Sequence, residues 1–439
     1  MVRAALPSLL ISSIVWSGTS ALGGVLVVDD APGPGVTHTN LSTAISDAAD
    51  GDTILVRPGL HGIVFIDGKS LTIVADGTPR PSIFGNLLVR NLSATQQVVL
   101  RGFDNIGVTL GSPGLRVLDC AGSVFVEDCT FDSTDGQGQG GISITPAVQV
   151  ERSDRVVFTR CALEATDSVL QSMSVFGSQQ VDGPHGLHAE DSHVALYDCV
   201  LRGAVGYAVG CHGGDGAMIA GGSLFASGCS FQGSQAGPAG TVFIFAVPAG
   251  DGGNGVRLTD RVTTGVAPYS RFQGSTTLTT PAIGRFVDCS FTTGLGGDGG
   301  ASPDGAPGQP IASLHGANAS LLGGPARSFE SSSPVHAGGS TTLTFNAPAG
   351  ELVFTAAAIG AQPIYVNALA GSFVPTLPFL FTPIGTMPAS GVLELTIPLP
   401  PLPASTGALQ IIHQAVYGTT TGEGRLGSPS TLVLLDPAY

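Results

Sequence analysis

The chain has 439 residues, of which 64 are glycine and 30 are proline, and only 11% are charged. Turn residues at this density, together with 43% hydrophobic residues, favour a folded all-β protein of many short strands over a helical or a disordered chain. The formal net charge of −15 and the absence of any basic run exclude a surface of the kind that binds nucleic acid.

Residues 1–23 are predicted to be a signal peptide. Arg3 supplies the positive start, residues 4–16 form a short apolar run, and Thr19 and Ala21 are suitable small residues for a cleavage site. A buried N-terminal strand is the alternative. No later segment contains ~20 unbroken apolar residues, so we expect no transmembrane segment after removal of the signal. These features predict a secreted, extracellular or cell-surface protein, with the periplasm as a further compartment.

Residues 40–49 carry apolar side chains at helical spacing after Asn40, which is a good N-cap. Short strands separated by turns are predicted to follow, at 53–56, 63–65 and 71–74. This order is typical of the first rung of a solenoid whose open end is covered by a helix.

Four segments further along the chain align on Cys129, Cys161, Cys199 and Cys229. In each segment, apolar residues occupy every second position. The alternation shifts by one position at the cysteine, which indicates a bend in the chain immediately before it. Strand, bend and strand at intervals of 32, 38 and 30 residues predict stacked rungs. The next interval, 60 residues to Cys289, is interpreted as two rungs with one degenerate copy, at 270–275 or at 256–263.

Equivalent residues of stacked rungs lie above one another, about 5 Å apart. Val124, Val156, Val194 and Leu224 are therefore expected to form one column. The four aligned cysteines are expected to form another column, of buried thiols. In-register parallel neighbours direct their Cβ atoms the same way, which suits disulfide torsions poorly.

The run 50–59, DGDTILVRPG, follows a strand at 27–30 and the helix. It resembles the first coil of bacterial pectate-lyase-like proteins, which are right-handed parallel β-helices. The resemblance implies this fold for residues 24–324. It implies little about activity, because that superfamily includes lyases, hydrolases, esterases, phage tailspikes and proteins with no known reaction.

From residue 294 the composition turns to glycine, proline, serine and alanine, and 294–310 is predicted to be a long loop. Residues 326–439 lack the repeat and contain six predicted strands, at 341–345, 352–356, 364–366, 392–397, 408–415 and 431–435. They are typical of a small β-sandwich. This part resembles the C-terminal all-β module of many secreted bacterial repeat proteins, whose role is unknown.

The densest polar cluster lies between residues 182 and 193. Three histidines and three carboxylates this close together could bind a divalent metal or supply an acid and a base. The catalytic candidates are Asp182, His185, His188, Glu190 and Asp191, and the candidate metal ligands are His185, His188, His193 and His212. The alternative is a set of solvated loop and strand residues, because the repeat places Met218 at the position of His188.

Complete catalytic motifs are missing. Pro184-His185-Gly186 is an incomplete match to a polygalacturonase motif, and the Arg-x-Pro-x-x-Arg run of pectate lyases is absent. The glycine-rich runs 213–216, 250–255 and 296–300 lack the nine-residue period of calcium-binding repeats and are interpreted as turns. No cofactor is expected, and calcium is a candidate ion without a complete motif.

Two functions follow from these observations. The first is a non-catalytic protein that presents a face of the solenoid to a polysaccharide or a cell-surface component. The second is a polysaccharide lyase or glycoside hydrolase with a diverged site around residues 182–212. The missing motifs favour the first.

Overall fold

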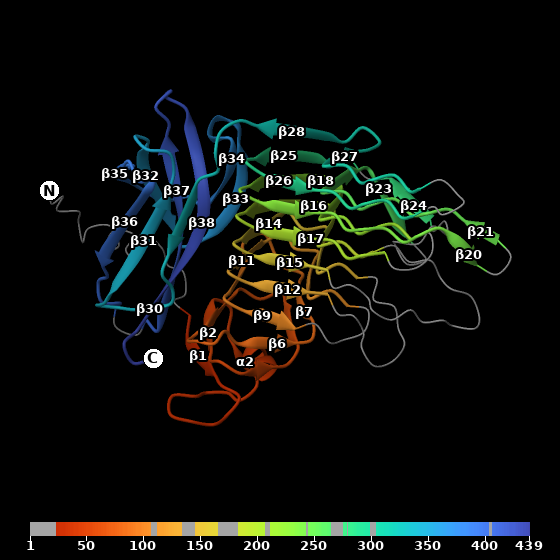
Figure 1. Ribbon diagram of the computed structural model, residues 1–439. Coiled ribbons are helices and arrows are strands. Elements are labelled where there is room, and N and C mark those ends of the chain that lie inside the picture. Colours follow the sequence, from red (N-terminus) through yellow and green to blue (C-terminus); the bar gives the residue numbers. More distant parts are fainter. Residues whose placement is uncertain are drawn as a thin grey trace.

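The computed structural model describes residues 23–106, 112–133, 145–165, 183–206, 211–242, 245–264, 275–278, 280–298, 304–403 and 406–439. They form two all-β bodies, a solenoid of stacked rungs and a sandwich that packs against its side (Figure 1). The predicted fold class, a right-handed parallel β-helix followed by a small β-sandwich, is confirmed. The predicted signal peptide lies almost wholly outside the described residues, and no described helix is long and apolar enough to cross a membrane.

The solenoid is built from three parallel ladders of strands. Ladder one contains β1 (Val25–Val28), β2 (Asp52–Val56), β5 (Leu71–Ala75), β8 (Gln97–Arg101), β11 (Ser123–Glu127), β14 (Arg155–Thr159), the second halves of β16 (Leu187–Tyr197) and β18 (Ala217–Ser227), β25 (Ile283–Val287) and β28 (Asn318–Leu322). Ladder two contains β3 (Leu60–His61), β6 (Ser82–Phe84), β9 (Asp104–Ile106), β12 (Thr130–Asp132), β15 (Ala162–Glu164), β17 (Val200–Arg202), β19 (Ser230–Gln232) and β26 (Ser290–Thr292). Ladder three contains β4 (Val64–Asp67), β7 (Leu87–Arg90), β10 (Leu115–Leu118), β13 (Val148–Glu151), the first halves of β16 and β18, β22 (Val256–Thr259) and β27 (Ile311–Ser313).

The predicted register of the rungs is confirmed. Val124, Val156, Val194 and Leu224 are successive register partners and belong to one continuous core. The residue before each of the four aligned cysteines, and before Cys289, has a positive φ, between 47° and 66°, which makes the expected bend. Aspartate at three of these positions and glycine at a fourth suit the left-handed region.

The interpretation of the 60-residue interval as two rungs is wrong. The second half of β18 pairs directly with β25, and β19 pairs with β26, so Cys229 and Cys289 lie on adjacent rungs. Two hairpins enlarge this rung, β20 (Gly240–Val242) with β21 (Phe245–Val247), and β23 (Arg261–Thr264) with β24 (Ser275–Leu278). Residues 256–259 are the ladder-three strand β22 of the same rung. Insertions at the corners of a rung leave the stack intact. The number of residues between two cysteines therefore does not give the number of rungs between them.

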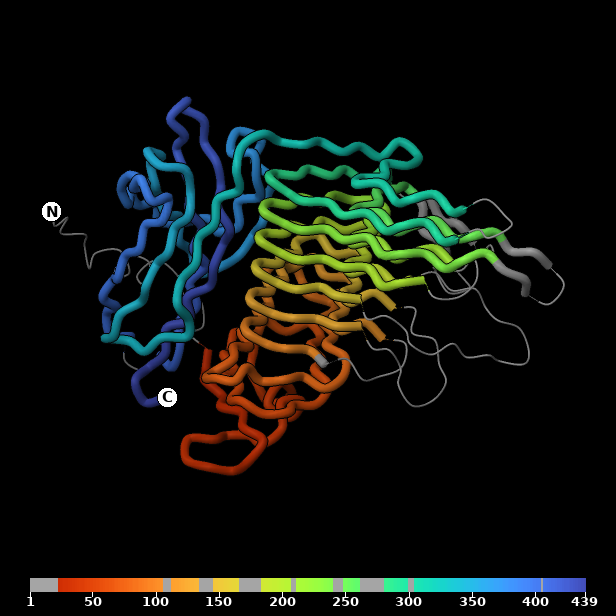
Figure 2. The backbone as a smooth tube through the Cα atoms, in the orientation of Figure 1, coloured from red at the N-terminus to blue at the C-terminus, as the bar shows by residue number. Residues whose placement is uncertain are grey.

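Between ladders two and three the later rungs extend far out from the solenoid, on the side away from the sandwich (Figure 2). We call the described parts of these excursions the lateral extension; they are residues 203–206, 211–216, 233–239, 248–255, 293–298 and 304–310. Hydrogen bonds cross this stack from Gly214 N to Ala204 O, Ser234 N to Gly214 O and Gly253 N to Ser234 O, at 2.8–2.9 Å. The predicted loop at 294–310 falls in this region.

The lateral extension has a period of three residues. Backbone N–H groups three residues apart donate to a neighbouring segment: Gly203 and Gly206, Ser234 and Gly237, and Gly250 and Gly253. Three residues per turn without internal hydrogen bonds is the geometry of a polyproline II chain. The glycines are required by close approach: a Cβ on Gly253 would lie 1.9 Å from the carbonyl oxygen of Gly214. The interpretation of runs 213–216 and 250–255 as turns is therefore wrong.

The helix α2 (Leu41–Asp47) lies at the N-terminal end of the solenoid, as predicted. The Asn40 side chain accepts a hydrogen bond from Thr43 N (3.1 Å), and Leu41, Ala44 and Ile45 are buried in the solenoid core. The helix thereby covers core side chains that would otherwise face water at the start of the stack.

The sandwich packs a sheet of three strands against one of five. The first contains β29 (Ser328–Ser331), β31 (Ser340–Asn346) and β36 (Val392–Pro398). The second contains β30 (Val335–His336), β38 (Gly424–Leu435), β37 (Ala408–Gly418), β32 (Leu352–Ala358) and β35 (Leu380–Thr386), and a hairpin of β33 (Ala361–Val366) and β34 (Gly371–Pro375) lies beside them. Residues such as Phe345 and Tyr417 fill the space between the sheets.

The sandwich covers the outward face of ladder one. Outward side chains of that ladder, among them Phe125 and Val157, form a buried cluster with Val374 and Ile412 of the sandwich. Nearer the N-terminus, Val27 and its neighbours pack on the strand β38 in the same way. Most strands of ladder one are thus buried on both faces, which accounts for their unbroken apolar runs, whereas the terminal strand β28 is exposed.

Candidate functional site

The predicted polar cluster lies where the lateral extension enters ladder three. His185 precedes β16, His188 and Glu190 lie on the outward side of its first half, and Asp191 makes the corner with a φ of 42°. His193 belongs to the second half of β16, in ladder one. Asp182 lies outside the described residues.

His185 is buried and accepts a hydrogen bond. Its Nδ1 lies 3.0 Å from Asp215 N, on the next rung, and 3.4 Å from the Asp215 carboxylate. Burial lowers the pKa of His185 to about 3, helped by the charge of Arg257 and opposed by that of Asp215. The ring is therefore neutral at neutral pH and acts as a hydrogen-bond acceptor between rungs.

Asp215 is the centre of this cluster and was not among the predicted site residues. Its buried carboxylate accepts hydrogen bonds from Asn254 N (2.7 Å) and Nδ2 (2.8 Å), and Arg257 Nε lies 2.9 Å away. These partners come from the following rung. The signal in the sequence is the pair of runs Gly-Gly-Asp-Gly and Gly-Gly-Asn-Gly, at 213–216 and 252–255, which stack in register.

His188 and Glu190 pair with each other on the outward side of β16, with Nε2 3.0 Å from Oε1. Glu190 is the register partner of Glu151 in β13. Glu151 in turn lies 2.8 Å from Arg116 and 3.3 Å from Arg152. Two carboxylates thus stand side by side on this face, each beside a basic group.

The four candidate metal ligands separate into different surroundings. His185 and His188 are neighbours, with ring centroids 5.9 Å apart. His193 is exposed, with Nδ1 2.8 Å from Ser223 Oγ, and His212 accepts a hydrogen bond from Asp251 N (2.8 Å) in the lateral extension. Within the part of the chain that the structure describes, no group of three or more His, Cys, Asp or Glu side chains is arranged to hold a metal ion.

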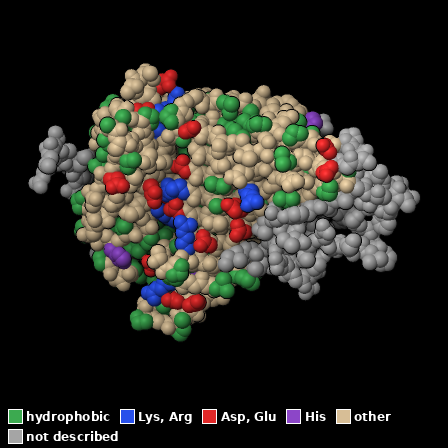
Figure 3. All heavy atoms as spheres, viewed as in Figure 1, with side chains coloured by type: hydrophobic (Ala, Val, Ile, Leu, Met, Phe, Trp, Pro, Cys, Tyr) green, Lys and Arg blue, Asp and Glu red, His purple; other side chains and the backbone are tan. Residues whose placement is uncertain are grey.

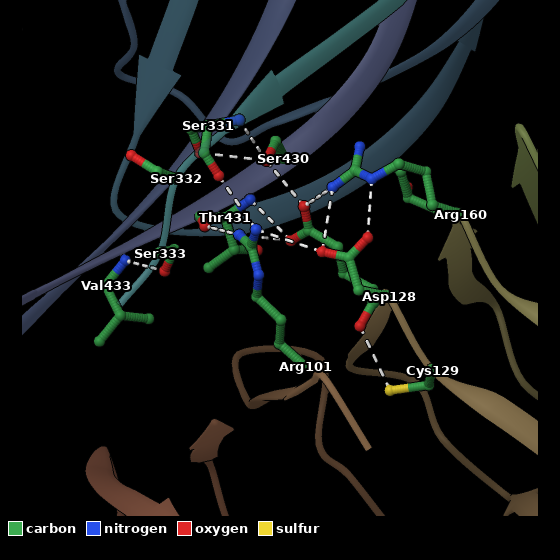
Figure 4. A network of polar contacts seen from close by, with 12 residues as sticks. Arg101, Asp128, Cys129, Arg160, Ser331, Ser332, Ser333, Ser430, Thr431 and Val433 are labelled. Carbon is green, nitrogen blue, oxygen red and sulfur yellow. Dashed lines mark hydrogen bonds and ion pairs between the residues drawn. The ribbon is translucent and has the colours of Figure 1, made fainter. Parts of the chain in front are cut away.

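A second polar cluster joins the solenoid to the sandwich (Figure 4). We call it the junction network; it consists of Arg101, Glu127, Asp128 and Arg160, from three successive rungs. Arg101 donates to the carbonyl of Ser331, in the sandwich, at 3.0 Å. Burial alone would raise the pKa of Asp128, but the hydrogen bond and charge of Arg160 outweigh it and hold this pKa below its usual value.

Charged side chains gather along the boundary between sandwich and solenoid on the face shown in Figure 3. Several ion pairs of the solenoid join an aspartate to an arginine of the next rung: Asp67 with Arg90, Asp119 with Arg152, Asp128 with Arg160 and Asp215 with Arg257. Such pairs lose a partner when a rung shifts its register. They therefore favour one alignment of the stack.

No known protein family matches the sequence, and no curated protein matches it. Among solved structures, pectate lyase Pel9A is similar with 12% identity and a TM-score of 0.23, covering 57% of this chain and 77% of that one. The enzymatically active domain of tailspike protein 2 of bacteriophage CBA120 gives 11% identity and a TM-score of 0.23, covering 91% and 74%. Likenesses this weak carry no argument about activity. The strand pairing itself defines the class: a parallel β-helix protein with a β-sandwich packed on its side.

Proposed function

We propose that this protein is a non-catalytic, extracellular or cell-surface β-helix that presents a side of its solenoid to a glycan or another surface partner. The observation that carries the proposal is the pairing of the predicted acid–base groups. His188 pairs with Glu190, and His185 and Arg257 with Asp215, across or within rungs. Both histidines are buried, 3% and 2% exposed, so they lie beyond hydrogen-bond reach of a substrate on the surface.

The partner surface lies outside ladder one, because the sandwich covers that face. On ladder three, one outward column runs through Arg116, Gln149 and His188 in register. Polar groups in such a column repeat every ~4.8 Å along the solenoid. His188 is buried, so the groups of this column that a partner can reach are Arg116 and Gln149, on neighbouring rungs. Their rung spacing suits an elongated partner such as a polysaccharide chain.

A glycoside hydrolase or polysaccharide lyase is the second candidate, and the placement of Glu151 and Glu190 favours it. Two carboxylates on one face are the groups that glycoside hydrolysis uses. Glu190 keeps 20% of its side chain exposed, so a substrate could reach it. Arg116 neutralises the charge of Glu151, and His188 lies 3.0 Å from a carboxylate oxygen of Glu190; both contacts weaken this alternative.

A panel of neutral and acidic polysaccharides, with and without calcium, separates the two. We expect retention of the protein on at least one polysaccharide, with no reducing ends or unsaturated products formed. Gln149→Ala should weaken retention, while Glu394→Gln, an exposed change on the sandwich, should leave it unaltered. Product formation that Glu190→Gln abolishes would establish the enzyme instead. Retention on no polysaccharide would overturn the glycan as partner.

A further inference from the structure

Five cysteines form one continuous column at the start of ladder two. They are Cys129, Cys161, Cys199, Cys229 and Cys289, and the strands that follow them are in register on successive rungs. Each thiol donates to the carbonyl oxygen of the residue two positions earlier, at 3.2–3.4 Å. All five side chains therefore have the same orientation, and none forms a disulfide.

The common orientation fixes the spacing of the sulfur atoms. Identical side chains on in-register parallel strands repeat at the rung spacing of ~4.8 Å. This is far longer than the ~2.05 Å of a disulfide. It is close to twice the ~2.3 Å length of a metal–thiolate bond. Neighbouring sulfurs are thus spaced to hold one cation between them in linear, two-coordinate fashion.

We propose that this cysteine column binds Cu(I), each ion held by the thiolates of two adjacent rungs. Thiolates bind Cu(I), zinc and iron–sulfur clusters. Structural zinc sites and the clusters use four protein ligands, so a site of two thiolates favours Cu(I). Such a site differs from one built by three or more converging ligands, which the described residues do not form. The first ion binds between Cys229 and Cys289.

Access to the column is from its C-terminal end. Cys129, Cys161, Cys199 and Cys229 are 1–2% exposed, whereas Cys289 is only partly buried. Its strand β26 is the last of ladder two, with β19 as its single neighbour in that sheet. An ion that reaches Cys289 from solvent can therefore displace the two thiol protons of this pair.

The charge balance is that of one ion between two thiols. Binding of Cu(I) releases two protons to solvent and leaves one net negative charge on the two thiolates. That charge lies at the partly exposed end of the column, and no oxidation or reduction is involved.

The alternative is that the cysteines only fill space as small core residues. Cys120 provides the matched control because it is equally buried but lies at another corner, beside Ser153 and with no cysteine in its own column. A space-filling role predicts the same behaviour for Cys120→Ser and Cys289→Ser. A copper column predicts that only the second changes binding.

The test uses the reduced full chain under anaerobic conditions, with Cu(I) supplied from the chromogenic chelator bicinchoninate. We expect the protein to withdraw at least one Cu(I), to gain ultraviolet thiolate–copper absorption and to unfold at a higher temperature. Cys289→Ser should lower the affinity at least tenfold, and Cys120→Ser should match the wild type. No withdrawal by the native protein, or equal withdrawal by Cys289→Ser, would overturn the proposal. A stoichiometric disulfide between Cys229 and Cys289 in aerobic protein would also overturn it, since the sulfurs would then lie too close together.

Discussion

The junction network can be tested through Glu127, whose carboxylate is fully buried between solenoid and sandwich. It accepts hydrogen bonds from Ser430 Oγ (2.7 Å) and Thr431 N (2.8 Å) of the sandwich. It also pairs with Arg101 at 3.2 Å and with Arg160. The change Glu127→Gln keeps the shape of the side chain and removes its charge.

Loss of this charge leaves two buried guanidinium groups with Asp128 as their remaining acidic partner in the network. Breaking a buried ion pair from one side costs about 3–5 kcal/mol, because the remaining charge stays out of water without compensation. The amide nitrogen of glutamine would also face donors where an acceptor is required. We therefore expect the free energy of unfolding to fall by about 3–5 kcal/mol.

Urea denaturation followed by circular dichroism measures this loss, and hydrogen exchange locates it. Faster exchange is expected in β38, where Thr431 contributes its backbone N–H. The control is Asp67→Asn, which removes an exposed ion pair with Arg90 of the same rung-to-rung kind and should cost at most ~1 kcal/mol. If Glu127→Gln costs no more than this control, the junction network does not hold the two bodies together.

Other changes test other parts of the structure. Burial raises the pKa of Asp198 to about 6, so the folded state binds this proton more tightly than the unfolded state. The contribution of this group to the free energy of unfolding therefore rises as the pH falls from 7 to 4. Asp198→Asn should remove up to about 3 kcal/mol of that rise, measured from unfolding curves at both pH values. Gly253→Ala places a Cβ 1.9 Å from a carbonyl oxygen and should lower the melting temperature by many degrees, whereas Gly323→Ala, with no atom within 4 Å, should not. Phe125→Ala should cost about 3–5 kcal/mol although this side chain points outward, and a loss below ~1 kcal/mol would contradict its burial under the sandwich.

The columns of the solenoid could be predicted because they depend on local spacing. Apolar residues at every second position mark the inward face of a strand. The shift of this alternation by one residue at Cys129 marks the bend at Asp128. Stacking then follows from geometry, since identical rungs pair in parallel only when equivalent residues coincide. This is why Val124 and Val156 could be assigned to one column from the sequence.

The lateral extension could not be predicted in the same way. Its segments pair with segments of other rungs, and Gly253 meets Gly214 across 39 residues of sequence. A glycine run looks the same to local rules whether it turns or packs against a neighbouring carbonyl. The period of three glycine positions in 250–255 was the available signal, and it becomes informative only when several such runs are compared.

The candidate site was predicted as one cluster because its residues are close in sequence. The structure divides it at Asp191, where the chain turns from ladder three into ladder one and carries His193 away from His188. It also adds Asp215 and Arg257, which are distant in sequence but one rung apart. In a solenoid, proximity along the chain is thus a poorer guide to a site than equivalence between rungs.

The same logic bears on the partner of the solenoid. Only 11% of the residues are charged, and the ion pairs joining Asp67, Asp119, Asp128 and Asp215 to arginines of the next rung use several of the sixteen arginines. An arginine already paired with a carboxylate has little capacity to bind a second anion. The net charge of −15 further repels a polyanion. Under the proposed function, recognition by this surface would therefore depend on uncharged hydrogen-bonding groups, and a neutral glycan is the partner that such groups favour.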